Sequence, residues 1–170
     1  MQSKQPFQLK IQKASAENVK DIQVVLSTTW QATYSNLSSE TIQQVKEKWH
    51  DTEFLTKQIE NPKFYFPIAL FEDKVVGIAT SAENETGIVE VFRLYILPEY
   101  QGHGIGTELL EKVSEHYPHA ELLRIYVEEN NQSAIAFYEH KGFKKLRKEE
   151  ETSFGEVMVD WVMEKQIAVD

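Results

Sequence analysis

The chain contains no cysteine, and this absence excludes several kinds of site at once. Disulfides, thiolate metal sites and a cysteine nucleophile are all ruled out. The five histidines do not form a convincing metal cluster. His116 and His119 are close in sequence, but Pro118 between them breaks the helix that would align them. We therefore expect no metal site.

Long hydrophobic runs are also missing. No apolar stretch approaches the ~20 residues that a helix needs to cross a bilayer. The first six residues, 1–6, have no apolar core segment, so the sequence does not predict a secretory signal. We expect a cytoplasmic protein with no membrane partner.

Basic residues are scarce relative to acidic ones. Lysine and arginine number 18 against 27 acidic residues, which gives a formal net charge of −9. Nucleic acid binding requires the opposite sign, because it works by neutralising phosphates. The acidic balance is typical of a soluble surface. It also allows a second interpretation, an electrostatic field that attracts a cationic acceptor such as an amine or polyamine.

Length and composition are those of an ordinary globular chain. Hydrophobic residues make up 41% and charged residues 26% of the 170 residues. That length fits one domain, 1–170, with a core over about residues 7–165. The sequence shows no internal repeat, low-complexity segment or linker.

Hydrophobic spacing predicts an α+β fold. Strands are expected at residues 7–11, 64–71, 75–80, 87–97, 122–127, 143–147 and 157–163. Helices are expected from Ser15 to Trp30, after Ser38, at 51–59, after Gly106, and at 131–141 with Gly142 as the left-handed terminating residue. The unit from Phe92 to Val127 predicts one parallel pair in a mostly antiparallel sheet.

The most informative segment has three glycines in five residues, Gly102, Gly104 and Gly106, between a strand and a helix. Glycine can take positive φ and lets another molecule approach the backbone closely. The first turn of a helix leaves N–H groups without partners and carries partial positive charge. Because the loop has neither Lys nor Arg, backbone N–H groups would hold a phosphate or pyrophosphate there.

Three kinds of loop fit these glycines less well. One is a turn that serves only tight helix–strand packing. A P-loop needs a lysine before Thr107, and none is present. A dinucleotide site could use Glu128 at the end of the next strand. However, Thr107 stands where Gly or Ala is expected, and residues 98–101 separate the strand from the glycines.

Two motifs together resemble the GNAT superfamily of acetyltransferases. Gln101-x-x-Gly104-x-Gly106 is similar to its pyrophosphate loop, and the segment 131–143, Asn-x-x-Ala-x-x-Phe-Tyr-x-x-x-Gly-Phe, is similar to its second signature. The resemblance implies the GNAT fold, a mixed and mostly antiparallel sheet of six to seven strands with splayed central strands and about four helices. It also implies N-acetyltransferase activity, with acetyl-CoA as cosubstrate and no metal.

The resemblance further implies roles for particular residues. The cosubstrate would contact Leu94, Tyr95, Ile96, Gln101, Gly102, His103, Gly104, Ile105, Gly106, Thr107, Asn131 and Tyr138. Tyr138 would be the general acid, although helical spacing also allows a core aromatic. Glu90 would be the general base, although a solvated strand carboxylate is the favoured role for it. Some relatives carry an acid directly before the residue matching Arg93, where this chain has Phe92.

The acceptor amine is expected near Trp30 and Tyr34, which fall at i, i+4 on one helix face. This segment resembles the end of the first helix in bacterial relatives, including spermidine/spermine acetyltransferases. The expected reaction is acetyl transfer to a primary amine of a small molecule such as a polyamine. Acetylation of a protein N-terminus or lysine, and a sensor that binds acetyl-CoA without turnover, stay open, as does a homodimer.

Overall fold

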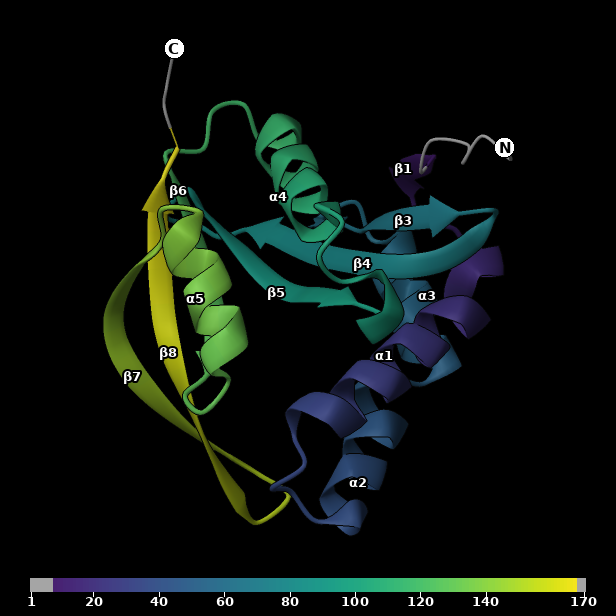
Figure 1. The fold of residues 1–170 in the computed structure, drawn as a ribbon, viewed down its shortest axis with the longest axis vertical. Coiled ribbons are helices and arrows are strands. Elements are labelled where there is room, and N and C mark those ends of the chain that lie inside the picture. The colour runs from purple at the N-terminus through teal and green to yellow at the C-terminus, as the bar shows by residue number, and fades with distance from the viewer. Residues whose placement is uncertain (1–7, 168–170) are drawn as a thin grey trace, which may run out of the picture.

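A mixed sheet of eight strands forms the centre of the computed structural model, which describes residues 8–167 (Figure 1). The strands are β1 (Leu9–Lys13), β2 (Phe64–Tyr65), β3 (Pro67–Phe71), β4 (Lys74–Glu83), β5 (Ile88–Ile96), β6 (Leu122–Glu128), β7 (Lys144–Ser153) and β8 (Glu156–Gln166). The N-terminal residues 1–6, which do not predict a secretory signal, and Phe7 of the first expected strand lie outside the described residues.

Five α-helices and two short 3-10 helices accompany the sheet in the described part of the chain. The α-helices are α1 (Val19–Thr33), α2 (Ser39–Trp49), α3 (Thr52–Glu60), α4 (Ile105–His116) and α5 (Gln132–His140), and the 3-10 helices are η1 (Ala16–Asn18) and η2 (Pro98–Tyr100). Within residues 8–167, no helix is both long enough and apolar enough to cross a bilayer.

The strand order is β1-β3-β4-β5-β6-β8-β7, and β2 pairs with β4 beside β3. β5 and β6 are parallel, whereas all other neighbouring strands are antiparallel. The predicted α+β class and the single parallel pair are therefore confirmed.

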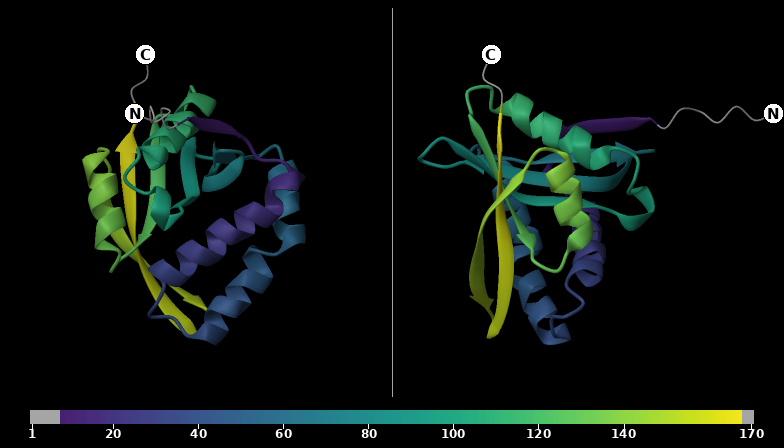
Figure 2. Two further views of the ribbon diagram at one scale, coloured as in Figure 1. Left: turned by 45° about the vertical axis from the view of Figure 1, so that its right-hand side comes forward. Right: turned by 60° about the vertical axis from the view of Figure 1, so that its left-hand side comes forward.

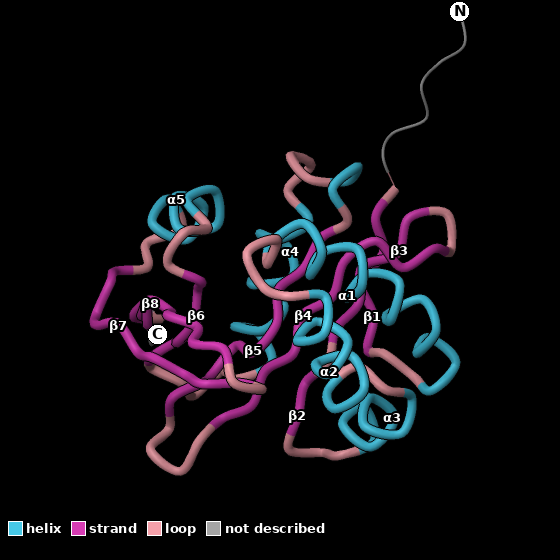
Figure 3. The backbone as a smooth tube through the Cα atoms, turned by 90° about the horizontal axis from the view of Figure 1, so that it is seen from below, coloured by secondary structure: helices cyan, strands magenta, loops and turns pink. Residues whose placement is uncertain are grey.

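Helices cover both faces of the first half of the sheet. α4 packs on one face of β3–β5, and α1 with α2 and α3 lies on the other (Figures 2 and 3). The inner face of α1 carries Ile22, Val25 and Leu26, which are fully buried. Burying these side chains stabilises the fold by roughly 1.5–3 kcal/mol each. α5 lies beside β6 and β8, away from α1, α2 and α3 (Figure 1).

The structure corrects several predicted strand boundaries. The strand expected at 64–71 is two strands, β2 and β3, interrupted at the buried Phe66; both pair with β4, and β3 also pairs with β1. β7 and β8 run well past the expected 143–147 and 157–163. They are joined by a turn at Phe154 and Gly155, both with positive φ. Nine of the ten β7 residues are exposed, so hydrophobic alternation could not mark its length.

The helix ends agree with the predictions from capping residues better than the strand ends agree with the predictions from hydrophobic spacing. Asn131 accepts a hydrogen bond from the Ala134 N–H at 3.1 Å, which confirms it as the N-cap of α5. Gly142 has φ 93°, as expected for a left-handed terminating residue. The helix expected after Gly106 in fact begins at Ile105. Gly104, with φ 80°, is its N-cap, so the helix starts inside the glycine loop.

Candidate active site

The two parallel strands separate halfway along their length. β5 and β6 pair only at residues 88–91 and 122–125. Beyond that point β5 stays paired with β4 as far as Ile96, and β6 stays paired with β8 as far as Glu128. A bulge at Phe92 bends β5 where the separation begins. Within the described part of the chain, one edge of residues 92–96 therefore has no neighbouring strand, which leaves room for an extended ligand.

A cleft of about 1240 Å³ occupies this gap. It extends from the glycine loop, past the separated strands and α5, to the end of α1. Of the residues predicted from sequence, it is lined by Tyr34, Leu94, Tyr95, Ile96, Gln101, Gly102, Gly104, Ile105, Gly106, Thr107, Asn131 and Tyr138. Trp30, Glu90 and His103 are not among its lining residues.

The glycine loop forms one end of the cleft. Gly102 and Gly104 have φ 81° and 80°, a conformation that L side chains rarely adopt. A Cβ built on Gly104 meets no atom within 4 Å, so the backbone there borders open space. Gly104 has no side chain to cap α4, and the first-turn N–H groups have no acceptor from an N-cap side chain. Backbone donors and the helix dipole thus create an anion site.

Two further contacts hold this loop in place. The Gln101 side-chain amide donates to the Ile96 carbonyl at 3.1 Å, which ties the loop to the end of β5. A Cβ on Gly106 would lie 3.2 Å from the Phe137 ring, so the glycine permits close packing of α4 against α5. Gly106 is therefore a packing glycine as well as a lining residue.

Tyr138 lies on the wall between the separated strands. It is only 8% exposed, lines the cleft, and packs edge-on against Phe143 with ring centroids 5.5 Å apart. Within residues 8–167, its hydroxyl forms no hydrogen bond. Burial, with a smaller contribution from Tyr95, raises the pKa of the Tyr138 hydroxyl far above its usual value. The hydroxyl therefore stays protonated and is a donor, not a base.

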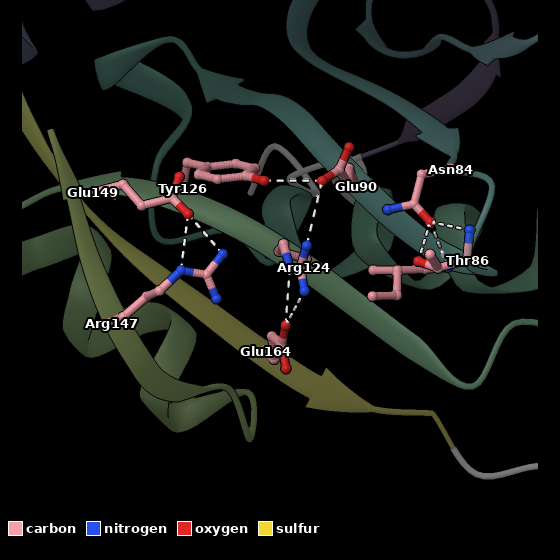
Figure 4. A network of polar contacts seen from close by, with 9 residues as sticks. Asn84, Thr86, Glu90, Arg124, Tyr126, Arg147, Glu149 and Glu164 are labelled. Carbon is pink, nitrogen blue, oxygen red and sulfur yellow. Dashed lines mark hydrogen bonds and ion pairs between the residues drawn. The ribbon is translucent and has the colours of Figure 1, made fainter. Parts of the chain in front are cut away.

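Glu90 belongs to a charged network on the face of the sheet opposite α5 (Figure 4). Its carboxylate accepts a hydrogen bond from the Tyr126 hydroxyl at 2.9 Å and pairs with Arg124 at 3.6 Å. Arg124 also forms an ion pair of 2.6 Å with Glu164. Glu90 does not line the cleft, but Tyr126 does. Any contact between Glu90 and a bound molecule would thus run through Tyr126 or solvent.

Three carboxylates form a row across the last strands, and hydrophobic spacing did not single them out. Glu128 pairs in register with Asp160, which pairs in register with Glu149. Glu128 is 8% exposed and lines the cleft. Burial, followed by Glu128, Glu151 and Glu149, raises the pKa of Asp160 to about 6.

The inner part of this row lacks a neutralising cation within residues 8–167. Among the described residues, no lysine or arginine forms an ion pair with Glu128 or Asp160. Glu128 accepts hydrogen bonds from the backbone and side chain of Asn130. Like charges directly opposite each other on adjacent strands are destabilising, so the row favours a cation supplied from outside.

The end of α1 closes the cleft near this row. Trp30 and Tyr34 share a helix face, with ring centroids 4.1 Å apart. Trp30 is 8% exposed and packs with Leu37 and Val45, so it supports Tyr34 from behind. Tyr34 lines the cleft, as Glu128 does, and burial, then Tyr95 and Asp160, raises the pKa of the Tyr34 hydroxyl. Of the two aromatics predicted for the acceptor, only Tyr34 borders the cleft.

Separated central strands beside a helix N-terminus that favours anions suit an enzyme with an extended, phosphate-bearing cosubstrate, as acyltransferases have. Comparison with known families agrees. The acetyltransferase (GNAT) family model matches residues 29–143, and the chain belongs to this family. The chain is thus an N-acetyltransferase with the GNAT fold, as the sequence motifs predicted.

Individual relatives resemble the chain to different extents. A spermidine N(1)-acetyltransferase of Thermoplasma acidophilum is 27% identical over 80% of this chain and 88% of that protein. The crystal structure of PaiA N-acetyltransferase from the same organism, in complex with coenzyme A, has a TM-score of 0.82. It shares 26% identity over 94% of this chain and 99% of that one. N-alpha-acetyltransferase 60 of Danio rerio is 28% identical over 49% of this chain, and the match spans only 45% of that protein.

Proposed function

We propose that the chain transfers an acetyl group from acetyl-CoA to a primary amine of a polyamine or similar small polycation. The observation that carries this proposal is the layout of the cleft. One end is a backbone anion site at Gly104, and the other end adjoins the uncompensated carboxylates Glu128 and Asp160. A phosphate-bearing cosubstrate and a cationic acceptor would each meet the opposite charge.

The cosubstrate end fits coenzyme A by its donors and its shape. The first-turn N–H groups of α4 would hold the pyrophosphate, since no cationic side chain stands in the loop. The unpaired edge of residues 92–96 would hold an extended chain as an added strand does. The coenzyme A complex of the PaiA structure supports this assignment. When bound, acetyl-CoA supplies the acetyl thioester.

Two groups of the chain would then act on the thioester. A backbone N–H among residues 94–96 would polarise its carbonyl, because a fixed dipole in a site that excludes water stabilises developing negative charge. The Tyr138 hydroxyl would donate its proton to the sulfur. The raised pKa of Tyr138 keeps that proton available at neutral pH.

The acceptor amine must lose a proton. We propose that Glu90 accepts this proton through the Tyr126 hydroxyl. Tyr126 lines the cleft and donates to Glu90, so its hydroxyl could take a proton from the amine as it passes its own to the carboxylate. A role for Glu90 by itself is disfavoured by its position outside the cleft.

The acidic row would bind the part of the acceptor that does not react. A polyamine carries further ammonium groups beyond the one acetylated, and each would gain from a desolvated carboxylate. Glu128 faces the cleft, and Asp160 stands directly behind it in the sheet. The spermidine acetyltransferase relative supports this acceptor class.

A second candidate acceptor is a protein N-terminus, favoured by the match to the zebrafish N-alpha-acetyltransferase. A thiol-release assay with acetyl-CoA separates the candidates. We expect spermidine and spermine to give kcat/KM at least about tenfold above a simple monoamine and above peptides with free N-termini. Preference for a peptide would replace the polyamine proposal. If acetyl-CoA binds but no acceptor gives thiol release, only a sensor is left.

The Glu128→Gln variant tests the acidic row directly. We expect KM for spermidine to rise about tenfold, with KM for a monoamine nearly unchanged, because only the polyamine carries a second ammonium. Glu121→Gln, which changes an exposed carboxylate directly before β6, is the control. Equal effects of Glu128→Gln on both acceptors would remove the row from acceptor binding.

A further inference from the structure

The sheet ends in an unusual edge strand. β7 is the last strand in the order and pairs only with β8, so one side of its backbone has no neighbouring strand among the described residues. Nine of its ten residues are exposed. Figure 2 shows β7 and β8 as a long ribbon at the margin of the molecule. An exposed edge of this length can pair with another strand unless its side chains prevent it.

The charges of β7 are separated along its length. Four cations stand in its first half and three acids follow, in the order Lys144, Lys145, Arg147, Lys148, Glu149, Glu150, Glu151. Edge strands commonly carry charge to discourage pairing. However, when two copies of this strand run antiparallel, the basic half of each meets the acidic half of the other. The charge pattern therefore favours one occupant of the edge, a second copy of the same chain.

We propose that two copies of the chain form a dimer with two-fold symmetry by antiparallel pairing of their β7 edges. A two-fold axis perpendicular to the sheet maps each face of the sheet onto itself. Each residue of one copy therefore lies opposite a residue of the second copy whose side chain is on the same face. Arg147, Glu149 and Glu151 share the face of Asp160. Lys148 lies on the opposite face, where it contacts Glu129 at 2.9 Å.

The regular part of the strand selects the register. A bulge at Leu146 interrupts pairing with β8, whereas residues 147–153 pair without interruption. We therefore place Glu149 on the two-fold axis, so that the residue pairs next to the axis lie within this regular part of the strand. Arg147 then faces Glu151 of the second copy, and Lys148 faces Glu150. The two Glu149 carboxylates meet on the axis, but each is already paired with Arg147 of its own chain at 2.6 Å.

The acidic half is free to accept these cations. Within residues 8–167, Glu150 has neither an ion pair nor a hydrogen bond from its side chain, and Glu151 accepts only from the Ser153 hydroxyl at 3.4 Å. Each charge pair occurs twice in a symmetric dimer. A single charge reversal at Glu150 therefore disrupts two contacts.

Sedimentation of the full chain over micromolar to millimolar concentrations tests this proposal. We expect a dimer at low salt whose Kd rises at molar salt. Glu150→Lys should raise Kd at least about tenfold, and Lys148→Glu should do the same. Glu111→Lys on the exposed face of α4 makes the same change in net charge as Glu150→Lys and should leave Kd unchanged. A wild-type chain that stays monomeric throughout would overturn the proposal.

Mixing the two variants gives the decisive measurement. In a mixed dimer the Glu150→Lys chain has a cation at positions 148 and 150, and the Lys148→Glu chain has a carboxylate at the same two positions. Both charge pairs between the copies are therefore restored. We expect the mixture to dimerise with about the wild-type Kd, although each variant alone dissociates. Failure of the mixture to recover, or an unchanged Kd in Glu150→Lys, would place any dimer contact elsewhere. Circular dichroism of each variant shows whether it is folded.

Discussion

At the scale of the residue, the site depends on side chains whose protonation is set by burial. Tyr138, a residue of α5, is buried, which raises its pKa and keeps its proton in place. Asp160 is partly enclosed and surrounded by other acids, which raises its pKa to about 6. In both cases burial makes the largest contribution, and neighbouring groups add to it.

Removing the Tyr138 hydroxyl tests the general acid. Tyr138→Phe should lower kcat by roughly 10²-fold, the usual scale for losing an acid, while the Kd for acetyl-CoA changes little. The ring packing against Phe143 is kept, so stability should be nearly preserved. Single-turnover kinetics and calorimetry provide the two measurements. A kcat within a few-fold of the wild type would leave Tyr138 as a core aromatic.

Asp160 should make stability depend on pH. Its pKa is raised on folding from 3.8 to about 6, so the folded chain holds a proton that the unfolded chain has lost between those values. Its destabilising effect is absent below about pH 4, grows as pH rises, and is complete above about pH 6. Asp160→Asn should therefore raise Tm at pH 8 and change it little at pH 4. A rise in Tm of the same size at both values would contradict this origin.

At the scale of the element, the start of α4 is the feature on which the proposed cosubstrate binding rests. The helix begins inside the glycine loop, at Ile105, because Gly104 takes a left-handed conformation. That position turns the first-turn N–H groups toward the cleft end that Gly102 and Gly106 also line. The helix and loop thus act as one unit, tied to β5 by Gln101.

Adding a Cβ at the start of α4 should weaken acetyl-CoA binding while the chain stays folded. Gly104→Ala should raise the Kd for acetyl-CoA about tenfold, equivalent to about 1.4 kcal/mol, because the methyl group would point into the open space beside the loop. Gly155→Ala is a matched control. Its φ of 82° imposes the same backbone strain, its Cβ also meets no atom within 4 Å, and it is not among the residues that line the cleft. Equal affinities in the two variants would refute the anion site.

At the scale of the whole molecule, the charge distribution bears on the two substrates that we propose. The net charge of −9 repels a polyanionic cosubstrate, so local backbone donors must overcome the general field. The same field attracts a polycation, and the uncompensated carboxylates at the cleft concentrate that attraction.

Ionic strength should therefore affect the two substrates in opposite ways. Raising salt through the physiological range should lower kcat/KM for spermidine several-fold, since screening weakens attraction beyond about 8–10 Å. The KM for acetyl-CoA should stay constant or fall. Steady-state kinetics in sodium chloride, with each substrate varied in turn, gives both values. A spermidine kcat/KM that does not change with salt would contradict electrostatic attraction of the acceptor.

Much of this molecule follows from local sequence. Spacing and capping residues placed the helices, as with Asn131 at the start of α5 and Gly142 after its end. The motifs at residues 101–106 and 131–143 identified the family. These features are readable because they depend on neighbours within a few residues, whose hydrogen bonds and left-handed conformations demand particular side chains.

The tertiary structure decided what depends on distant partners. Glu128, Asp160 and Glu149 are separated in sequence, and only strand pairing brings them into one row. Glu90 is bound to Tyr126 and Arg124, and Trp30 is covered by Leu37 and Val45, which no local pattern reveals. The full length of β7 was equally hidden, because an exposed edge strand has no buried face to impose alternation. The sequence by itself determined the family and the glycine loop, whereas long-range packing determined which charges face the cleft.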